Sequence, residues 1–294
     1  MSTYFIKDLE KLSGIKAHTI RIWEKRYEIV QPKRTETNIR YYSNEDLKKI
    51  LNVSILNRNG MKISTISRMD DKEIEQNVLD LNKLEDDYLS YIENLILAMI
   101  DLDEERFERI ISHLVTRIGF QQTLIKVIHP FFNKIGVLWL TGSINPAQEH
   151  FVSNLIRQKL IVAVDGLTNS LKENSKRFLL FLPEDEWHEL GLLFYQYLIK
   201  SHGHRVVYLG QSVPHSDVVK VSNIKRPDYV FTLVTAPMTE DKFQAFLREL
   251  SSCFPKQTVF VGGLQIREFN KTLPSNIAKV TSGEQFVDFL KEIV

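Results

Sequence analysis

The period of the hydrophobic pattern changes near position 176, and this change restricts the possible folds more than any other feature of the sequence. Before it, apolar residues recur every three or four positions, as in Leu89, Ile92, Leu95, Met99 and Ile100. This spacing is typical of amphipathic helices. After it, short apolar runs alternate with helical stretches, as in parallel sheets whose strands are joined by helices. We therefore expect an α-helical first part and an α/β last part.

The last part, residues 176–294, predicts a flavodoxin-like (Rossmann-like) doubly wound parallel sheet. Strands are expected at 178–182, 205–209, 228–234, 258–261 and 278–281, and helices at 188–201, 215–223, 239–251 and 284–293. Ligands of such sheets bind beyond the carboxyl ends of the strands. Any ligand of this domain should therefore meet the loops that follow the strands.

Three short motifs lie in those loops. An acid, a histidine and a glycine follow the first strand, a five-residue loop follows the second, and a glycine pair follows the fourth: Glu186-x-His188-x-x-Gly191, Gly210 to Pro214, and Gly262-Gly263. The histidine suits a metal ion, because the acid can hold its second ring nitrogen and the glycine allows close backbone approach. A glycine pair after a strand is by itself more often a plain turn. The other histidines of this part are expected to be surface or cap residues: His202, His204 and His215.

Residues 87–172 predict a bundle of four helices, preceded by a polar, partly helical linker over 73–86. Breaks are expected at Gly119, Pro130 and 142–146. Trp139 is followed after nine residues by Glu149-His150, so the ring and the acid–imidazole pair can face one cavity. On spacing alone, a core tryptophan and an exposed polar pair are the commoner arrangement.

Positive charge is concentrated near the N-terminus. Residues 1–68 hold 14 Lys and Arg against 7 Asp and Glu, whereas the rest of the chain holds 24 against 30. Such an imbalance suits a polyanion such as DNA, although an ordinary solvated face gives the same count. The local sequence motifs have to distinguish a DNA-binding surface from an ordinary solvated face.

Two short helices around Gly14, over 4–15 and 16–27, predict a helix-turn-helix. The second helix would enter the major groove of DNA with its N-terminal residues at the bases. A turn-rich hairpin follows over 31–43, and such a wing contacts phosphates. The residues at the groove end of the second helix are His18, Thr19 and Arg21.

These motifs resemble the winged helix of the MerR transcription-factor family. The resemblance rests on Thr19-Ile-Arg-Ile-Trp-Glu-Lys-Arg-Tyr27, on Pro32-Lys-Arg-Thr and on Arg40-Tyr-Tyr-Ser-Asn-Glu-Asp-Leu47. It implies a DNA-binding domain over residues 1–72, with phosphate contacts by Arg21, Arg34 and Arg40, Tyr41 nearby, and Thr19 close to the bases. MerR proteins dimerise through a coiled coil after this domain. This chain has no sustained heptad repeat at that position, so other parts of the chain must form any oligomer.

The other motifs resemble the cobalamin-binding half of the light-sensing MerR repressors, the CarH/LitR group. There, a Trp-x9-Glu-His motif lies above the corrin ring, a histidine on the sheet is the lower cobalt ligand, and the nucleotide tail of the cofactor runs into a slot beside the sheet. The resemblance implies His188 as the lower ligand with Glu186 as its partner, and His150 as the upper ligand after photolysis. It implies further cofactor contacts by Trp139, Glu149, Gly191, Ser212, Val213, Gly262 and Gly263.

The third strand departs from that family. Where the family has Ser-x-Leu or similar, this chain has Phe231-Thr232-Leu233-Val234-Thr235. The hydroxyl that contacts the nucleotide tail is therefore expected at Thr232 or at Thr235.

The function implied is a DNA-binding transcriptional regulator, a repressor rather than an enzyme. Adenosylcobalamin, with methylcobalamin as the alternative, and light would set the oligomeric state, dimer or tetramer, and thereby the affinity for operator DNA. A light-independent regulator that responds to another corrinoid, or has lost cobalamin binding, stays open. A corrinoid methyl-carrier subunit of an enzyme is the alternative of another class, against which the winged helix argues.

The composition predicts a protein of the bacterial cytosol. The chain is 43% hydrophobic and 26% charged, and no apolar run approaches the ~20 residues of a membrane span. The N-terminus has no signal-peptide core. Cys253 is the only cysteine, which excludes an internal disulfide and argues against a cysteine zinc site.

Overall fold

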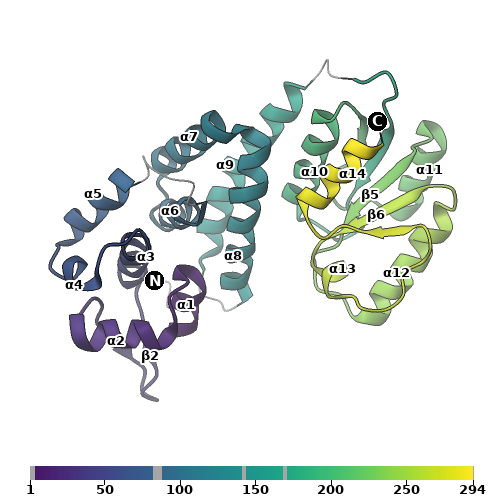
Figure 1. Ribbon diagram of the computed structural model, residues 1–294. Coiled ribbons are helices and arrows are strands. Elements are labelled where there is room, and N and C mark those ends of the chain that lie inside the picture. Colours follow the sequence, from purple (N-terminus) through teal and green to yellow (C-terminus); the bar gives the residue numbers. More distant parts are fainter. Residues whose placement is uncertain (1–3, 82–87, 141–143, 168–170, 294) are drawn as a thin grey trace. The chain divides into compact units, whose positions relative to one another are not determined.

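The computed structural model describes residues 4–81, 88–140, 144–167 and 171–293, except for the side chains of 79–81 and 137–140. The chain divides into two compact units, Met1–Val152 and Ser153–Val294 (Figure 1). Helix α9 (Pro146–Asp165) contributes its first residues to unit 1 and the others to unit 2. None of the helices in the described ranges is long and apolar enough to cross a membrane.

Unit 1 begins with a winged helix. Its elements are α1 (Ile6–Ser13), α2 (Ala17–Tyr27), the antiparallel strands β1 (Lys33–Arg34) and β2 (Arg40–Tyr41), α3 (Asn44–Arg58) and α4 (Ile63–Ile66). Gly14 ends α1 because it adopts a left-handed conformation, with φ of 72°, which costs a glycine little. Ser43 begins α3, where its hydroxyl accepts a hydrogen bond from the Asp46 N–H at 3.2 Å. The expected helix-turn-helix and wing are confirmed.

The remaining helices of unit 1 form a bundle. They are α5 (Asp71–Leu81), which lies mostly in the segment expected to be a linker, α6 (Tyr88–Asp101), α7 (Glu104–Thr123), a π-helical turn η1 (Leu124–Ile128), α8 (His129–Leu140) and the start of α9. The expected break at Gly119 is a kink inside α7. The expected break at Pro130 was wrong, because the helical backbone continues from α7 through η1 into α8.

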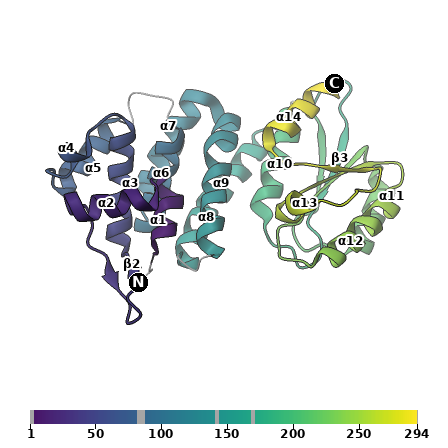
Figure 2. The same ribbon diagram turned by 60° about the horizontal axis from the view of Figure 1, so that its bottom comes forward.

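The winged helix packs directly on the bundle. Helix α3 contacts α6, and α1 contacts α8, as both views show (Figure 2). The Arg58 guanidinium donates hydrogen bonds to both carboxylate oxygens of Glu93 on α6, at 3.2 and 2.5 Å. The Lys134 ammonium on α8 donates to the Leu12 carbonyl at 2.8 Å. The DNA-facing elements are therefore joined to the bundle by packed helices and polar contacts.

Unit 2 holds a five-stranded parallel sheet in the order β4-β3-β5-β6-β7. The strands are β3 (Arg177–Phe181), β4 (Arg205–Tyr208), β5 (Tyr229–Leu233), β6 (Thr258–Gly262) and β7 (Ile277–Lys279). The order is that of flavodoxin-like folds, so the expected fold class is confirmed.

Helices cover both faces of this sheet. Helices α10 (Glu189–Ser201) and α14 (Gly283–Glu292) pack together on one face, and α11 (His215–Lys225) and α12 (Glu240–Cys253) cover the other (Figure 1). The short α13 (Leu264–Glu268), next to β6, was not expected from the sequence.

The two faces of the sheet have different cores, because successive residues of a strand point to opposite sides. The α11/α12 face is mainly aliphatic. It includes Val230 of β5 and Val234, the first residue after that strand. The α10/α14 face is aromatic. Its rings, with centroids of neighbours 4.4 to 6.5 Å apart, belong to Phe178, Tyr195, Tyr229, Phe231, Phe260, Phe286 and Phe289.

Candidate functional site

His188 lies at the carboxyl end of β3, as the N-cap residue of α10. Its side chain is 60% exposed, and its Nδ1 is hydrogen-bonded to Glu186 Oε1. Since Nδ1 is held by the carboxylate, a metal ion would be met by Nε2. This is the usual arrangement of a metal-ligating histidine with a carboxylate behind it. No group of three or more His, Cys, Asp or Glu side chains in the described ranges is placed to hold a metal ion.

Glu186 orders this edge of the sheet. Its side chain is 2% exposed, and its Oε2 accepts hydrogen bonds from the backbone N–H groups of Thr235 and Ala236 at 2.6 and 2.8 Å. Burial alone would raise the pKa of this carboxyl. The hydrogen bonds from His188, Ala236 and Thr235 outweigh burial and lower the pKa to about 2. The carboxylate is therefore ionised at neutral pH and ties the loop after β3 to the loop after β5.

The loop after β4 joins the same cluster. The Ser212 N–H donates to the Glu186 carbonyl at 3.2 Å, and the Ser212 hydroxyl accepts from the Asp185 N–H at 3.2 Å. The Val213 N–H donates to the Leu182 carbonyl at 2.9 Å. The structure thus brings together the first two sheet motifs expected from the sequence.

Leu233 occupies the space between two of the motif glycines. A Cβ atom on Gly191 would lie 2.7 Å from Leu233 Cδ1, and a Cβ atom on Gly262 would lie 2.6 Å from Leu233 Cδ2. We call the space flanked by Gly191 and Gly262 the glycine slot. A side chain at either position would therefore have to displace the end of the Leu233 side chain.

Gly263 is required by the backbone. It adopts φ of 97°, and a Cβ atom there would lie 2.4 Å from the Val234 carbonyl oxygen. The close crossing of the chain after β6 and the chain after β5 therefore needs no ligand to explain it.

The two candidate tail-contacting threonines lie in different places. Thr232 is fully buried, and by the alternation of β5 it faces α11 and α12, away from Leu233. Its hydroxyl oxygen has no hydrogen-bond partner among the described residues. Thr235 is half-buried at the sheet edge, where its N–H is bonded to Glu186.

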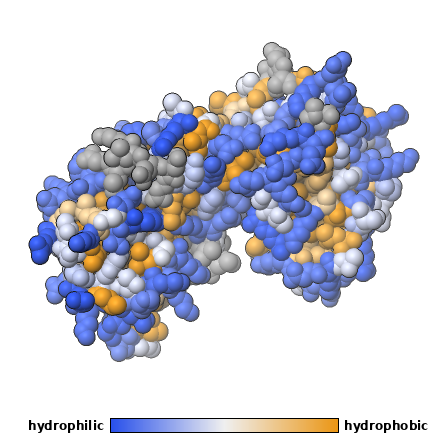
Figure 3. Space-filling model, in the orientation of Figure 1, coloured by the Kyte–Doolittle hydropathy of each residue, from blue (hydrophilic) through white to orange (hydrophobic). Residues whose placement is uncertain are grey.

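A polar network next to His188 was not expected from the sequence. Glu189 forms an ion pair with Arg157 of α9 and accepts a hydrogen bond from the Tyr208 hydroxyl at 3.2 Å. These residues are far apart in the sequence and belong to no common motif, so no sequence signal could have grouped them. Large apolar side chains are exposed near the same edge at Trp187 and Leu264, and hydrophobic surface gathers around β6 and α13 (Figure 3).

The expected bundle motif lies in unit 1. Glu149 and His150 are on the first turns of α9, with Glu149 Oε2 2.8 Å from His150 Nδ1 and the His150 side chain largely exposed. Trp139 falls within α8, but its side chain lies outside the described residues. The expected meeting of these three residues with His188 stays a prediction.

One of the three remaining histidines of unit 2 departs from expectation. His202 is the C-cap residue of α10, as expected. His215 is half-buried at the start of α11, 2.7 Å from Glu249 Oε1. His204 is 1% exposed, because it packs against Phe178 and accepts a hydrogen bond from the Lys176 N–H at 3.2 Å. The expectation of a surface or cap position was wrong for His204, because its ring is covered by Phe178 and lies near the Leu290 carbonyl.

The expected DNA-contact residues of α2 lie at its N-terminal end. His18 and Arg21 are exposed and Thr19 is half-buried, whereas Ile20 and Trp23 are buried in the core of the winged helix. This side of α2 can therefore approach a groove without disturbing the fold.

The wing places cations beside α2. Arg34 is exposed and lies opposite Arg40 in the register of the antiparallel strands β1 and β2. Tyr41 is half-buried. Glu24 of α2 anchors the wing, since it accepts a hydrogen bond from the Tyr42 hydroxyl at 2.5 Å and lies 3.5 Å from Arg40 Nε.

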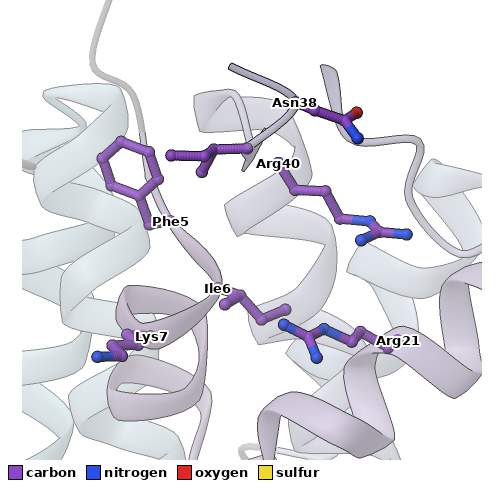
Figure 4. Close-up of a pocket in the computed structure, with 7 residues that line it drawn as sticks. Phe5, Ile6, Lys7, Arg21, Asn38 and Arg40 are labelled. Carbon is purple, nitrogen blue, oxygen red and sulfur yellow. The ribbon is translucent and has the colours of Figure 1, made fainter. Parts of the chain in front are cut away.

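A pocket lies between the wing and the starts of α1 and α2 (Figure 4). Arg21 and Arg40 both border it, and Lys7 of α1 is a third cation that the sequence did not suggest. Arg21 and Arg40 beside one hollow suit a phosphate group, whereas the Lys7 ammonium points away from both guanidinium groups (Figure 4). The complete lining is Phe5, Ile6, Lys7, Arg21, Asn38, Ile39 and Arg40.

Two family models match the N-terminal part of the chain, one over the winged helix and one over the helix bundle. Residues 4–73 match the family described as MerR HTH family regulatory protein, and residues 91–163 match the B12 binding domain. The chain is 27% identical over 295 residues to the HTH-type transcriptional repressor CarH of Myxococcus xanthus, covering 98% of each chain. It is also 27% identical over 295 residues to the repressor CarA of the same organism, covering 99% of this chain and 95% of that one.

A solved structure supports the fold. The monomethylamine corrinoid protein of Methanosarcina barkeri matches with a TM-score of 0.52 at 15% identity, covering 67% of this chain and 95% of that one. At this identity the likeness concerns the fold alone. The curated relatives, by contrast, are named as transcriptional repressors and not as enzymes.

Proposed function

We propose that the chain is a CarH-like regulator that joins a MerR-type helix-turn-helix module to a B12-binding domain, and that it is a transcriptional repressor whose binding to operator DNA is controlled by a corrinoid. The observation that carries the proposal is the presence of both modules in one chain that is similar to CarH over nearly its whole length. The basic winged helix supplies the DNA-facing part and the edge of the sheet around His188 supplies the ligand-facing part.

The DNA-facing part is proposed to read bases with α2 and to hold phosphates with the wing. His18 and Thr19 are at the end of α2 that would face the bases. Arg21 and Arg40 border one pocket and would hold a phosphate there, and Arg34 and Tyr41 would extend the contact along the wing. Phosphate contacts give affinity and base contacts give choice of sequence.

The two ends of the corrinoid site differ in how well they suit the cofactor. At the cobalt end the donor is suitable, because His188 is exposed and its ring is oriented by an ionised, buried carboxylate. At the nucleotide end the glycine slot is filled by Leu233. We therefore assign His188 and Glu186 to the cobalt, and no residue to an inserted nucleotide. When bound, a corrinoid would supply a cobalt ion, which the His188 imidazole would hold.

Helices α3 and α6 are the proposed connection between the bundle and the DNA-facing elements. The Arg58–Glu93 pair, the Lys48–Asp101 pair and the contact from Lys134 to the Leu12 carbonyl all join the winged helix to the bundle. A shift of the bundle would therefore move α1 and α3 as well, since packed elements transmit displacement.

The finer proposal concerns the signal. Adenosylcobalamin, with methylcobalamin as the alternative, and light would set whether the protein is a dimer or tetramer or dissociates, with His150 and Trp139 of the bundle facing the upper side of the corrin. Several winged helices in one particle would bind an operator far more tightly than one.

The test is a DNA-binding titration of the full chain without ligand, with adenosylcobalamin in darkness, and after green light, together with the particle mass in solution. We expect tight binding and a larger particle in darkness, and loss of both after light. His188→Ala should remove the response to the ligand, whereas His202→Ala, at the cap of α10, should keep it. Unchanged DNA binding and unchanged mass across all conditions would refute the proposal.

A further inference from the structure

Leu233 fills the glycine slot on the α10/α14 face of the sheet. Leu233 is 5% exposed and fills the slot with both of its terminal methyl groups. Val280 closes it from the side of β7, because its carbonyl oxygen and Cβ would lie 3.7 and 3.8 Å from a Cβ atom on Gly262. The slot is therefore part of the protein core.

The aromatic face continues the packing behind Leu233. Phe231, two residues earlier on β5, points to the same face and is fully buried. Its ring centroid lies 4.4 Å from that of Tyr195 on α10 and 5.1 Å from that of Phe286 on α14. Phe260 on β6 lies 5.4 Å from Phe286. A group entering along this face would have to displace Leu233 and then separate large buried rings.

The cobalt end of the site has the opposite character. His188 is exposed, and Glu186 holds it in place through hydrogen bonds to two other loops. Trp187 and Leu264 are exposed apolar side chains close to this edge, suited to the flat apolar surface of a corrin ring. The described residues therefore offer a ligand for cobalt and a surface for the ring, while the glycine slot is filled by Leu233.

We propose that Leu233 makes this site selective for corrinoids whose lower nucleotide stays outside the sheet, so that tail-less corrinoids of the cobinamide class bind more tightly than cobalamins. This inference rests on the proposed function, since it concerns the ligand of the same site. In a cobalamin, the cofactor's own base occupies the lower position of cobalt and has to leave before His188 can coordinate. Breaking the bond between this base and cobalt costs free energy. Because Leu233 fills the slot, burial of the released nucleotide cannot offset this cost. A cobinamide has no such base to displace.

The test compares adenosylcobinamide with adenosylcobalamin, which differ in the nucleotide tail. Both are titrated into the full chain in darkness, and binding is followed by calorimetry and by the visible spectrum, which reports the axial ligands of cobalt. We expect adenosylcobinamide to bind at least about tenfold more tightly. His188→Ala should abolish the spectral change for both compounds.

Two matched leucine variants identify the residue responsible. Leu233→Ala should open the glycine slot and reduce the preference for adenosylcobinamide by about tenfold or more. Leu247→Ala removes another buried leucine, on the α11/α12 face, and should leave the preference unchanged. Circular dichroism of both variants shows that each is folded. If Leu233→Ala leaves the preference intact, the assignment to Leu233 is overturned.

The remaining outcomes separate this inference from the proposed function. Adenosylcobalamin binding as tightly as adenosylcobinamide, or more tightly, would overturn the inference while the corrinoid-controlled regulator stands. Binding of neither compound, with DNA binding intact, would overturn the corrinoid part of the proposed function and the inference with it.

Discussion

Arg58 and Glu93 form a two-point ion pair between the last residue of α3 and the middle of α6. The Glu93 side chain is fully buried, and the Arg58 side chain is 30% exposed. A buried carboxylate is stable only when it is paired and hydrogen-bonded. The pair therefore makes the contact between the winged helix and the bundle specific as well as close.

Arg58→Ala should destabilise unit 1 strongly. The substitution removes two charge-assisted hydrogen bonds from a buried carboxylate, and breaking such a pair costs about 3 kcal/mol. Urea unfolding of the full chain measures the loss. Glu45→Ala is the control, because its pair with Lys48 is on the surface and should be worth less than about 1 kcal/mol. Equal effects of the two substitutions would show that the Arg58–Glu93 contact contributes no more than a surface pair.

Arg21→Ala should weaken DNA binding without changing the choice of sequence. Arg21 is exposed and borders the cationic pocket beside the wing, so it is expected to contact a phosphate. Removal of one such contact reduces the slope of log affinity against log salt by about 1. Fluorescence anisotropy at several salt concentrations measures both quantities. Lys220→Ala, an exposed lysine of α11, should leave the slope unchanged, and a sequence-dependent loss for Arg21→Ala would argue for a base contact instead.

Gly263→Ala should destabilise unit 2. The residue has φ of 97°, and a Cβ atom would lie 2.4 Å from the Val234 carbonyl oxygen, so both backbone strain and a steric clash oppose any side chain. The expected loss is about 3 kcal/mol, measured by urea unfolding. Gly166→Ala provides the comparison, because a Cβ atom there would come no closer than 3.5 Å to any atom. A near-neutral Gly263→Ala would mean that the crossing of the two loops adjusts easily.

His204 should make the stability of unit 2 depend on pH. Burial lowers the pKa of His204 below 6.5, and the nearby Lys172, His202 and Lys176 lower it further, against a hydrogen bond to the Leu290 carbonyl. Because the unfolded chain then binds the proton more tightly, the free energy of unfolding is highest above pH about 6.5 and falls as the pH decreases towards the folded-state pKa.

Replacement of His204 tests this sign. His204→Gln keeps an acceptor for the Lys176 N–H but does not titrate, so the free energy of unfolding should vary less between pH 7 and pH 5 than in the wild type. His18→Gln, at an exposed position of α2, should keep the wild-type slope. An unchanged slope in His204→Gln would show that other groups control stability in this range.

The secondary structure and the winding of the sheet followed from the sequence because they depend on local periodicity. The alternation of apolar runs and helical stretches predicted all five strands of unit 2, and Gly14 and Ser43 marked the ends of helices by their conformational preferences. The short α13 escaped prediction because one turn of helix has no period of its own.

The contents of the site were harder to predict, because a motif does not say what fills the space around it. Glycine at 191 and 262 suggested room for a ligand, but the same residues are needed to accommodate Leu233. That distinction depends on which face of β5 each side chain points to. The Arg58–Glu93 and Arg157–Glu189 pairs join segments far apart in the sequence, and His204 was expected at the surface or at a cap although it is buried. Each of these features is set by tertiary packing.

The hydrogen bonds of the Glu186 carboxylate affect the entropy of ligand binding. This carboxylate already fixes the loops after β3 and β5 in the absence of any ligand, so little conformational entropy remains to be lost when a metal centre docks on His188. Association should then be limited by encounter rather than by loop rearrangement, and its temperature dependence should reflect the apolar area covered by the ring.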